Sequence, residues 1–259
     1  MERRARDARV TSLPTAGGLT AAWVLVTLVS MLGVSPDPEL QGAGTQPVGT
    51  RGTETDRASD RPEIPLGLDL YLPVPEDNPL SPERVALGRT LFFDPILSRD
   101  QSRACADCHD PERAFTDGRA LSVGVFGRVG TRSVPTLVNR AYGRSFFWDG
   151  RTSSLEDQVL QPIQDPKEMD MALSDVVVRL RRDRVYSARF QTRFGRIPTH
   201  VDLANALASY VRTILSGDAP IDRYMNGERD ALSAQARDGL RIFRGKGTLH
   251  GLPRRSDAH

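Results

Sequence analysis

Both cysteines of this 259-residue chain lie in one short stretch, RACADCHDP, at residues 103–111. Cys105 and Cys108 are three positions apart, and His109 follows directly. Two thiols at this spacing can bond to two vinyl groups on one edge of a haem, and the adjacent histidine can then bind the iron. The C-x-x-C-H pattern therefore predicts one covalently attached haem c, with His109 as the ligand to the metal.

Two other kinds of site use paired cysteines, and the rest of the sequence argues against both. A thioredoxin-like redox pair follows a strand in an α/β domain, and no stretch of this chain alternates as a strand would. A structural zinc site needs four ligands, and the chain has no second cysteine pair. Covalent haem attachment is the interpretation that needs only the residues present.

The sequence after residue 65 has the start and stop signals of helices. Ser153 and Glu156 match a capping box. Apolar residues recur at helical spacing after Thr199, and Gly217 is a candidate end of that helix. Further candidate N-caps are Ser81, Ser174 and Ser233. These signals predict an all-α fold, with long irregular segments between the helices and a porphyrin supplying part of the apolar core.

The first 65 residues read as export and linker sequence. Four arginines in residues 1–9 precede an apolar run at 19–34. This pattern predicts a secretory signal or an N-terminal anchor in the inner membrane, with the rest of the chain in the periplasm. Residues 35–65 are rich in proline, glycine, threonine and charge, which is typical of a disordered linker.

The charge of the chain argues against one class of partner. The formal net charge is only +2 at pH 7. Nucleic-acid-binding proteins concentrate positive charge to neutralise phosphates, so nucleic acid is not expected as a partner.

Longer stretches of the chain resemble the bacterial di-haem cytochrome c peroxidases and their methylamine-utilisation relatives. The matches lie within residues 66–247 and include LGRTLFFDPILS, CADCHDPERAFTDG, FFWDGRTSSLEDQVLQPI and LSAQARDGLRIFRGKG. The resemblance implies two all-α class I cytochrome c domains with one haem each. It also implies an oxidoreductase that reduces hydrogen peroxide to water, with electrons from a small cytochrome or a copper protein that enter at the second haem.

The resemblance assigns further site residues. Trp148 matches a tryptophan that lies between the two haems, although from this chain alone it would be taken as a buried aromatic. Gln158 and Glu168 match polar residues of the peroxide pocket, and Pro162 is expected to wall that pocket. We expect Glu168 to move the proton between the peroxide oxygens, with Gln158 as its hydrogen-bonding partner. Without the resemblance, Glu168 would be a solvated loop charge.

Three positions depart from the family pattern. Many members have an iron-capping histidine where this chain has Val125, so we expect an open sixth coordination position. An asparagine that often helps to bind calcium is replaced by Ser133, which weakens the case for calcium. The second C-x-x-C-H motif is missing, and the tail contains only His250 and His259, which read as solvated residues.

These features predict four segments: residues 1–34 as signal or anchor, 35–65 as linker, 66–216 as the peroxidatic domain, and 217–259 as the truncated start of a second haem domain. One choice of codons for residues 247–256, read one base later, encodes the missing motif, so a frameshift is one hypothesis for the tail.

The alternative to a peroxidase is a mono-haem electron-transfer protein without peroxidase turnover. A large protein substrate, as in the methylamine-utilisation relatives, is also left open.

Overall fold

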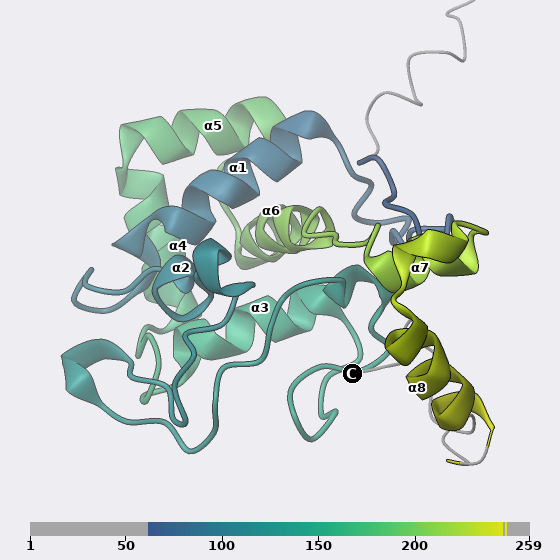
Figure 1. Cartoon of the computed structure of the whole chain (residues 1–259). Helices are drawn as coiled ribbons and strands as arrows, with labels where there is room; N and C mark the ends of the chain where they lie inside the picture. The colour runs from purple at the N-terminus through teal and green to yellow at the C-terminus, as the bar shows by residue number, and fades with distance from the viewer. Residues whose placement is uncertain (1–61, 246, 248–259) are drawn as a thin grey trace, which may run out of the picture. The chain divides into compact units, whose positions relative to one another are not determined.

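The computed structural model describes residues 62–245 and 247, and these residues form helices and turns without a β-sheet (Figure 1). All of them belong to one compact unit, Gly52–His259. The predicted signal or anchor, most of the linker, His250 and His259 lie outside the described residues. Within the described part of the chain, no helix is both long and apolar enough to span a membrane.

Eight α-helices and five short 3₁₀ turns follow one another in the described residues. The α-helices are α1 (Pro82–Phe93), α2 (Cys105–Cys108), α3 (Leu155–Gln164), α4 (Leu173–Arg182), α5 (Arg184–Phe194), α6 (His200–Arg212), α7 (Pro220–Met225) and α8 (Ala234–Arg244). The 3₁₀ turns are η2 (Pro95–Leu97), η3 (Pro111–Arg113), η4 (Val125–Gly127), η5 (Arg140–Tyr142) and η6 (Arg229–Ala231), with α2 itself a single helical turn. The predicted all-α fold is confirmed.

Several helices begin where the sequence predicted. The hydroxyl oxygens of Ser81, Thr199 and Ser233 accept hydrogen bonds from backbone N–H groups in the first turns of α1, α6 and α8. Each cap satisfies a donor that a helix start would otherwise leave unpaired.

Three helix boundaries differ from the prediction. Ser154, and not Ser153, caps α3 by accepting from the backbone N–H of Asp157. Helix α4 begins at Leu173, so Ser174 lies inside it. Helix α6 ends at Arg212 rather than near Gly217. Gly217 instead packs closely against the start of the described chain, since a Cβ there would lie only 2.4 Å from the carbonyl oxygen of Leu66.

The apolar core is built around α6, which lies between α1 and α3 (Figure 1). Gly88 of α1 lets the two backbones approach, because a Cβ there would lie 1.9 Å from the carbonyl oxygen of Ala206. Fully buried core side chains include Leu91, Phe92, Leu97, Ile163, Leu180, Phe190, Leu203 and Leu207. Helix α6 therefore serves as the scaffold on which α1 and α3 are placed.

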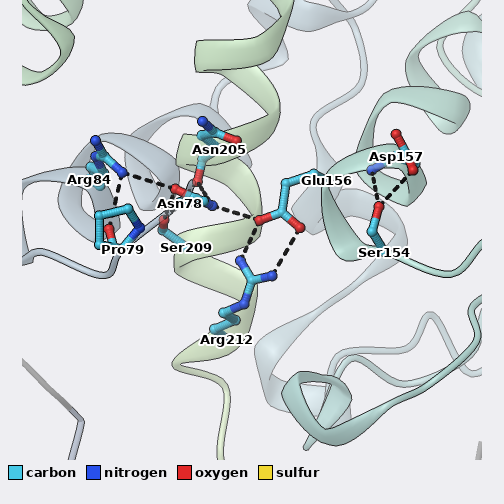
Figure 2. Close-up of polar contacts among 9 residues, drawn as sticks. All are labelled: Asn78, Pro79, Arg84, Ser154, Glu156, Asp157, Asn205, Ser209 and Arg212. Carbon is cyan, nitrogen blue, oxygen red and sulfur yellow. Dashed lines mark hydrogen bonds and ion pairs between the residues drawn. The ribbon is translucent and has the colours of Figure 1, made fainter. Parts of the chain in front are cut away.

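A buried polar cluster fastens α3 to α6 and to the segment before α1 (Figure 2). The Arg212 guanidinium donates to both oxygens of the Glu156 carboxylate, at 2.6 and 2.9 Å. The Asn78 amide donates to Glu156 at 2.7 Å and to the carbonyl of Asn205 at 3.1 Å. Because Glu156 makes these contacts, it is not the carboxylate that caps α3.

The segment that leads into α7 is held to the beginning of the described chain. The Asp218 N–H donates to the carbonyl of Leu66 at 2.8 Å. Gly67 has φ +90°, and a Cβ there would lie 2.2 Å from the Asp222 side chain, so only glycine fits. Helix α8 follows α7 and η6 and buries none of its residues. The domain boundary at residues 216 and 217 stays a prediction.

Candidate functional site

The C-x-x-C-H motif forms one helical turn, α2, with His109 at its C-terminal end. The Asp107 carboxylate accepts from the backbone N–H of Ala104 at 2.7 Å, which satisfies a donor at the start of the turn. The His109 N–H donates to the carbonyl of Cys105 at 2.9 Å and closes it. Cys105 and Cys108 are both free thiols, and three-residue spacing on a helix places them on the same side.

The His109 ring is oriented for metal binding. Its Nδ1 lies 3.0 Å from the carbonyl oxygen of Phe115, which can only accept, so Nδ1 carries the proton. Ala114 and Phe115 both have positive φ, a strained turn that brings this carbonyl to the ring. The Nε2 lone pair therefore remains available, and burial lowers the pKa of His109 and favours the neutral, ligating form.

The thiols lie in an apolar environment close to a carboxylate. Burial raises the pKa of Cys105 to about 12 and that of Cys108 to about 11, so both thiols are protonated at neutral pH. For Cys108 the next largest cause is the negative charge of Glu168, which also raises the pKa of Cys105. The structure therefore brings Glu168 near the C-x-x-C-H turn from 59 to 63 positions away in the sequence.

Glu168 lines a hollow of about 270 Å³ at the end of α3. The pKa of its carboxyl is raised to about 7, mainly by burial and then by the charge of Asp165, against the opposing effect of the Arg151 charge. The residues that line the hollow are Phe147, Arg151, Gln161, Pro162, Gln164, Asp165 and Glu168. Pro162 and Glu168 thus share one pocket, and a carboxyl group with a pKa near 7 can both take up and release a proton there.

The backbone at Glu168 is held by the loop that contains Val125. The Val125 N–H donates to the carbonyl of Glu168 at 2.8 Å, and the Val125 side chain is fully buried. A Cβ on Gly124 would lie 2.2 Å from the carbonyl oxygen of Lys167 and 2.4 Å from that of Glu168. The absence of a side chain at Gly124 therefore determines where Glu168 lies, a role that sequence reasoning missed.

Gln158 and Trp148 are placed differently from the pocket residues. Gln158 is on α3 but does not line the hollow, whereas Gln161, one turn further on, does. Trp148 is 61% exposed, and its Nε1–H donates to the carbonyl of Ser133 at 2.9 Å. The interpretation of Trp148 as a buried aromatic is therefore wrong.

Sequence reasoning also missed Arg151. Its Nε donates to the Gln161 side-chain oxygen at 3.2 Å, and the Gln161 amide donates to the Thr152 hydroxyl at 2.7 Å. The sequence offered a signal for this residue, because Arg151 lies three positions after Trp148 in the same FFWDGRT stretch. That stretch closes into a tight loop through the Phe146 N–H, which donates to the carbonyl of Thr152 at 2.8 Å.

The residues present fit a covalently attached haem. Two thiols one turn apart and a histidine with a free Nε2 form the donor set that this group requires. Partly exposed apolar side chains that pack against the core supply surface for a porphyrin: Ala106, Phe115, Phe147, Val159 and Leu160. Within the described residues, no group of three or more His, Cys, Asp or Glu could hold a different metal ion.

Comparison with protein families gives one match, to the model described as di-haem cytochrome c peroxidase, over residues 82–230. The methylamine utilization protein MauG of Methylorubrum extorquens is 45% identical over 180 residues, which cover 68% of this chain and 50% of that protein. Cytochrome c551 peroxidase of Pseudomonas aeruginosa is 34% identical over 187 residues, which cover 69% of this chain and 54% of that protein. The chain spans about half the length of the curated relatives it matches.

Solved structures show the same fold. A MauG-like protein associated with microbial copper homeostasis superposes with a TM-score of 0.63 and 32% identity, covering 70% of this chain and 55% of that one. The diheme peroxidase BthA of Burkholderia thailandensis superposes with a TM-score of 0.57 and 28% identity, covering 65% of this chain and 48% of that one.

Proposed function

This chain belongs to the di-haem cytochrome c peroxidase family, and from that premise we propose that it is an exported c-type haem protein that reduces hydrogen peroxide to water. The proposed compartment is the periplasm, and the proposed electron donor is a small cytochrome or a copper protein. The observation that supports the proposal is the place of Glu168, a carboxyl with a pKa of about 7 that lines a hollow at the end of α3 and whose charge raises the pKa of Cys108.

Three residues would hold the haem. Cys105 and Cys108 would bond to its vinyl groups, and Nε2 of His109 would bind the iron on one face. When bound, the haem supplies the redox-active iron that passes electrons to the peroxide. The Phe115 carbonyl fixes the orientation of His109, and burial keeps its ring neutral.

The chain's own chemistry in this reaction is proton movement. Reduction of one hydrogen peroxide to two waters consumes two electrons and two protons, and breaking the O–O bond requires a proton on the departing oxygen. The Glu168 carboxylate can accept a proton from one peroxide oxygen and return it to the other. Its pKa near 7 suits both steps at neutral pH, since neither protonation state is strongly favoured.

Steady-state turnover with peroxide and a reduced small cytochrome tests the proposal. Glu168→Gln should retain haem content and lower the rate of reaction with peroxide by about 10²-fold or more. Glu76→Gln, which removes an exposed carboxylate remote from the hollow in sequence, is the matched control and should react as the wild type does. Unchanged kinetics in Glu168→Gln would remove this residue from the mechanism. A loaded, redox-active wild type without turnover would instead favour the mono-haem electron-transfer alternative.

A second candidate function is peroxide-driven oxidation of a large protein substrate. The two methylamine utilization relatives are 45% and 39% identical to this chain. The indole of Trp148 is exposed, so it could accept an electron from a protein substrate bound at this surface. Trp148→Phe should then react with peroxide as the wild type does but oxidise an external electron donor more slowly. Equal rates of donor oxidation in the two proteins would argue against this second function.

A further inference from the structure

Arg151 is held on the wall of the Glu168 hollow by three neighbours. Its guanidinium carbon lies 3.4 Å from the centroid of the Phe147 ring, which is a stacked arrangement. Its Nη1 donates to both oxygens of Asp149, at 3.0 and 3.2 Å, and its Nε donates to Gln161 at 3.2 Å. A planar guanidinium with one face and two of its nitrogens engaged has little freedom to rotate.

The loop that carries Arg151 is itself constrained. Phe147 has φ +65°, which is unusual for an aromatic residue, and Gly150 has φ +66°. Strained non-glycine residues persist where the surrounding contacts over-determine them, and they gather at functional sites. The strain at Phe147 turns its ring under the guanidinium, so the loop conformation and the position of Arg151 depend on one another.

The charge of Arg151 is only partly compensated by its hydrogen-bond partners. Its third nitrogen, Nη2, has no hydrogen-bond partner within residues 62–245. The Asp149 carboxylate is shared with a second guanidinium, that of Arg132, at 3.1 Å. Because Asp149 is shared between two guanidinium groups, it does not fully neutralise Arg151.

Four segments surround Glu168, and two of them supply the charges that shift the pKa of its carboxyl. Asp165 opposes its ionisation from the end of α3, and Arg151 favours it from the Phe146–Thr152 loop. The loop at Gly124 and Val125 contributes only backbone contacts to Glu168. The α2 turn contributes Cys105 and Cys108, which carry no charge when protonated or bonded to haem. Arg151 is therefore the one cation that acts on this carboxyl among the groups of the described chain that shift it.

We propose that Arg151 is a positioning residue of the pocket, a fixed guanidinium that favours the ionised form of Glu168 and so helps to set the pH range in which the site reacts with peroxide. The proposal rests on the proposed function, because it assigns Arg151 a role in the same proton transfer. Arg151 acts through Glu168 and through the Gln161 amide that it orients.

The test compares Arg151→Gln with Arg132→Gln in the haem-loaded chain. Arg132 is a matched control, because it binds the same Asp149 carboxylate and is similarly exposed (50%, against 45% for Arg151) but does not line the hollow. In Arg151→Gln the midpoint of the peroxide reaction rate against pH should rise by about 0.5 to 1 unit, because an opposite charge near a carboxyl lowers its pKa and solvent screens a half-exposed pair. At pH 6 this shift makes the reaction about threefold to tenfold slower. Arg132→Gln should keep the wild-type midpoint.

A readout that does not depend on activity separates this proposal from the proposed function. The Glu168 carboxyl is titrated by carbon-13 NMR in the diamagnetic carbon monoxide form of the loaded chain, with Glu168→Gln to assign its signal. In Arg151→Gln the titration midpoint of the Glu168 carboxyl should rise by the same amount as the midpoint of the peroxide reaction rate. A wild type that does not react with peroxide overturns the proposed function, while the NMR titration still decides whether Arg151 controls Glu168.

Two results would overturn the role of Arg151. The first is an Arg151→Gln chain with normal haem content and an unchanged Glu168 midpoint. The second comes from Arg151→Lys, which keeps the charge but loses the planar fork. A lysine variant whose midpoint returns at least halfway to the wild-type value supports the role, whereas one that shifts as far as the glutamine variant assigns the effect to lost packing.

Discussion

Replacing Arg212 with methionine removes one partner of the buried ion pair that fastens α3 to α6 (Figure 2). Methionine keeps much of the side-chain volume, so the main change is electrostatic. Glu156 loses its two short hydrogen bonds to the guanidinium and keeps only the one from Asn78, at 2.7 Å. A carboxylate left in that place has no cation to compensate its burial.

The expected loss of unfolding free energy is about 3 kcal/mol. Breaking a buried ion pair from one side costs about 3 to 5 kcal/mol. The Glu156 side chain retains 19% of its exposure, against 5% for Arg212, so water can partly solvate the orphaned carboxylate. That places the cost at the lower end of the range.

Denaturant unfolding of the loaded chain, followed by circular dichroism, measures the loss. Arg241→Met is the control, because its i,i+3 pair with Asp238 is exposed to solvent, so its loss should leave stability close to that of the wild type. Adding Glu156→Gln to Arg212→Met should recover about 1 kcal/mol or more, since the unpaired charge is then gone. A loss below about 1 kcal/mol in Arg212→Met, or no recovery in the double variant, would refute the reasoning.

The same pair predicts a pH dependence of stability. Burial raises the pKa of Glu156, but the hydrogen bonds from Arg212 and Asn78 outweigh it, so the net pKa lies below the ordinary value of 4.5. A lowered carboxyl pKa stabilises the fold above the unfolded-state pKa, and this contribution disappears as pH falls through the folded-state pKa. As pH falls below about 4.5, the stability gap between wild type and Arg212→Met should therefore narrow. A gap that stays constant over this range would contradict this assignment.

Three further predictions concern the pocket. Gly124→Val should displace the Glu168 backbone, because a Cβ meets the Lys167 carbonyl at 2.2 Å, and it should slow the peroxide reaction by about 10²-fold in stopped-flow measurements while haem attachment is kept. The wild-type rate should rise with pH through a midpoint of about 7, the pKa that burial gives Glu168, and a midpoint near 4.5 would show that the carboxyl is solvated. The ferric chain should have a high-spin absorption spectrum as purified, because Val125 cannot bind iron, and a low-spin spectrum at the first haem would show that another residue occupies the sixth position.

Local sequence patterns were sufficient to locate the C-x-x-C-H motif, the candidate haem-binding site, and much of the helical framework. C-x-x-C-H is a contiguous motif whose chemistry depends on spacing within one turn, and the structure places it on α2. Ser81, Thr199 and Ser233 cap helices as predicted, because capping uses backbone donors only two or three residues away. The all-α class follows from the same local signals.

The sequence offered two possible N-caps for α3, and only the tertiary structure shows which one is used. Ser153 with Glu156 and Ser154 with Asp157 both offer a serine followed three residues later by a carboxylate. Arg212, 56 positions away, binds Glu156 in the folded chain and leaves Ser154 and Asp157 to cap α3. No window of sequence around α3 contains that information.

The chemistry of the pocket was decided in the same way. By itself the sequence determined the candidate haem donors, the helical class and the identity of Glu168 as an ionisable group. Its burial, its neighbours Asp165 and Arg151, and its backbone contact with Gly124 and Val125 arise only when separate segments pack together. Spacing along the chain specifies which atoms are available, whereas a pKa depends on solvent exposure and on charges in three dimensions, and these exist only in the folded protein.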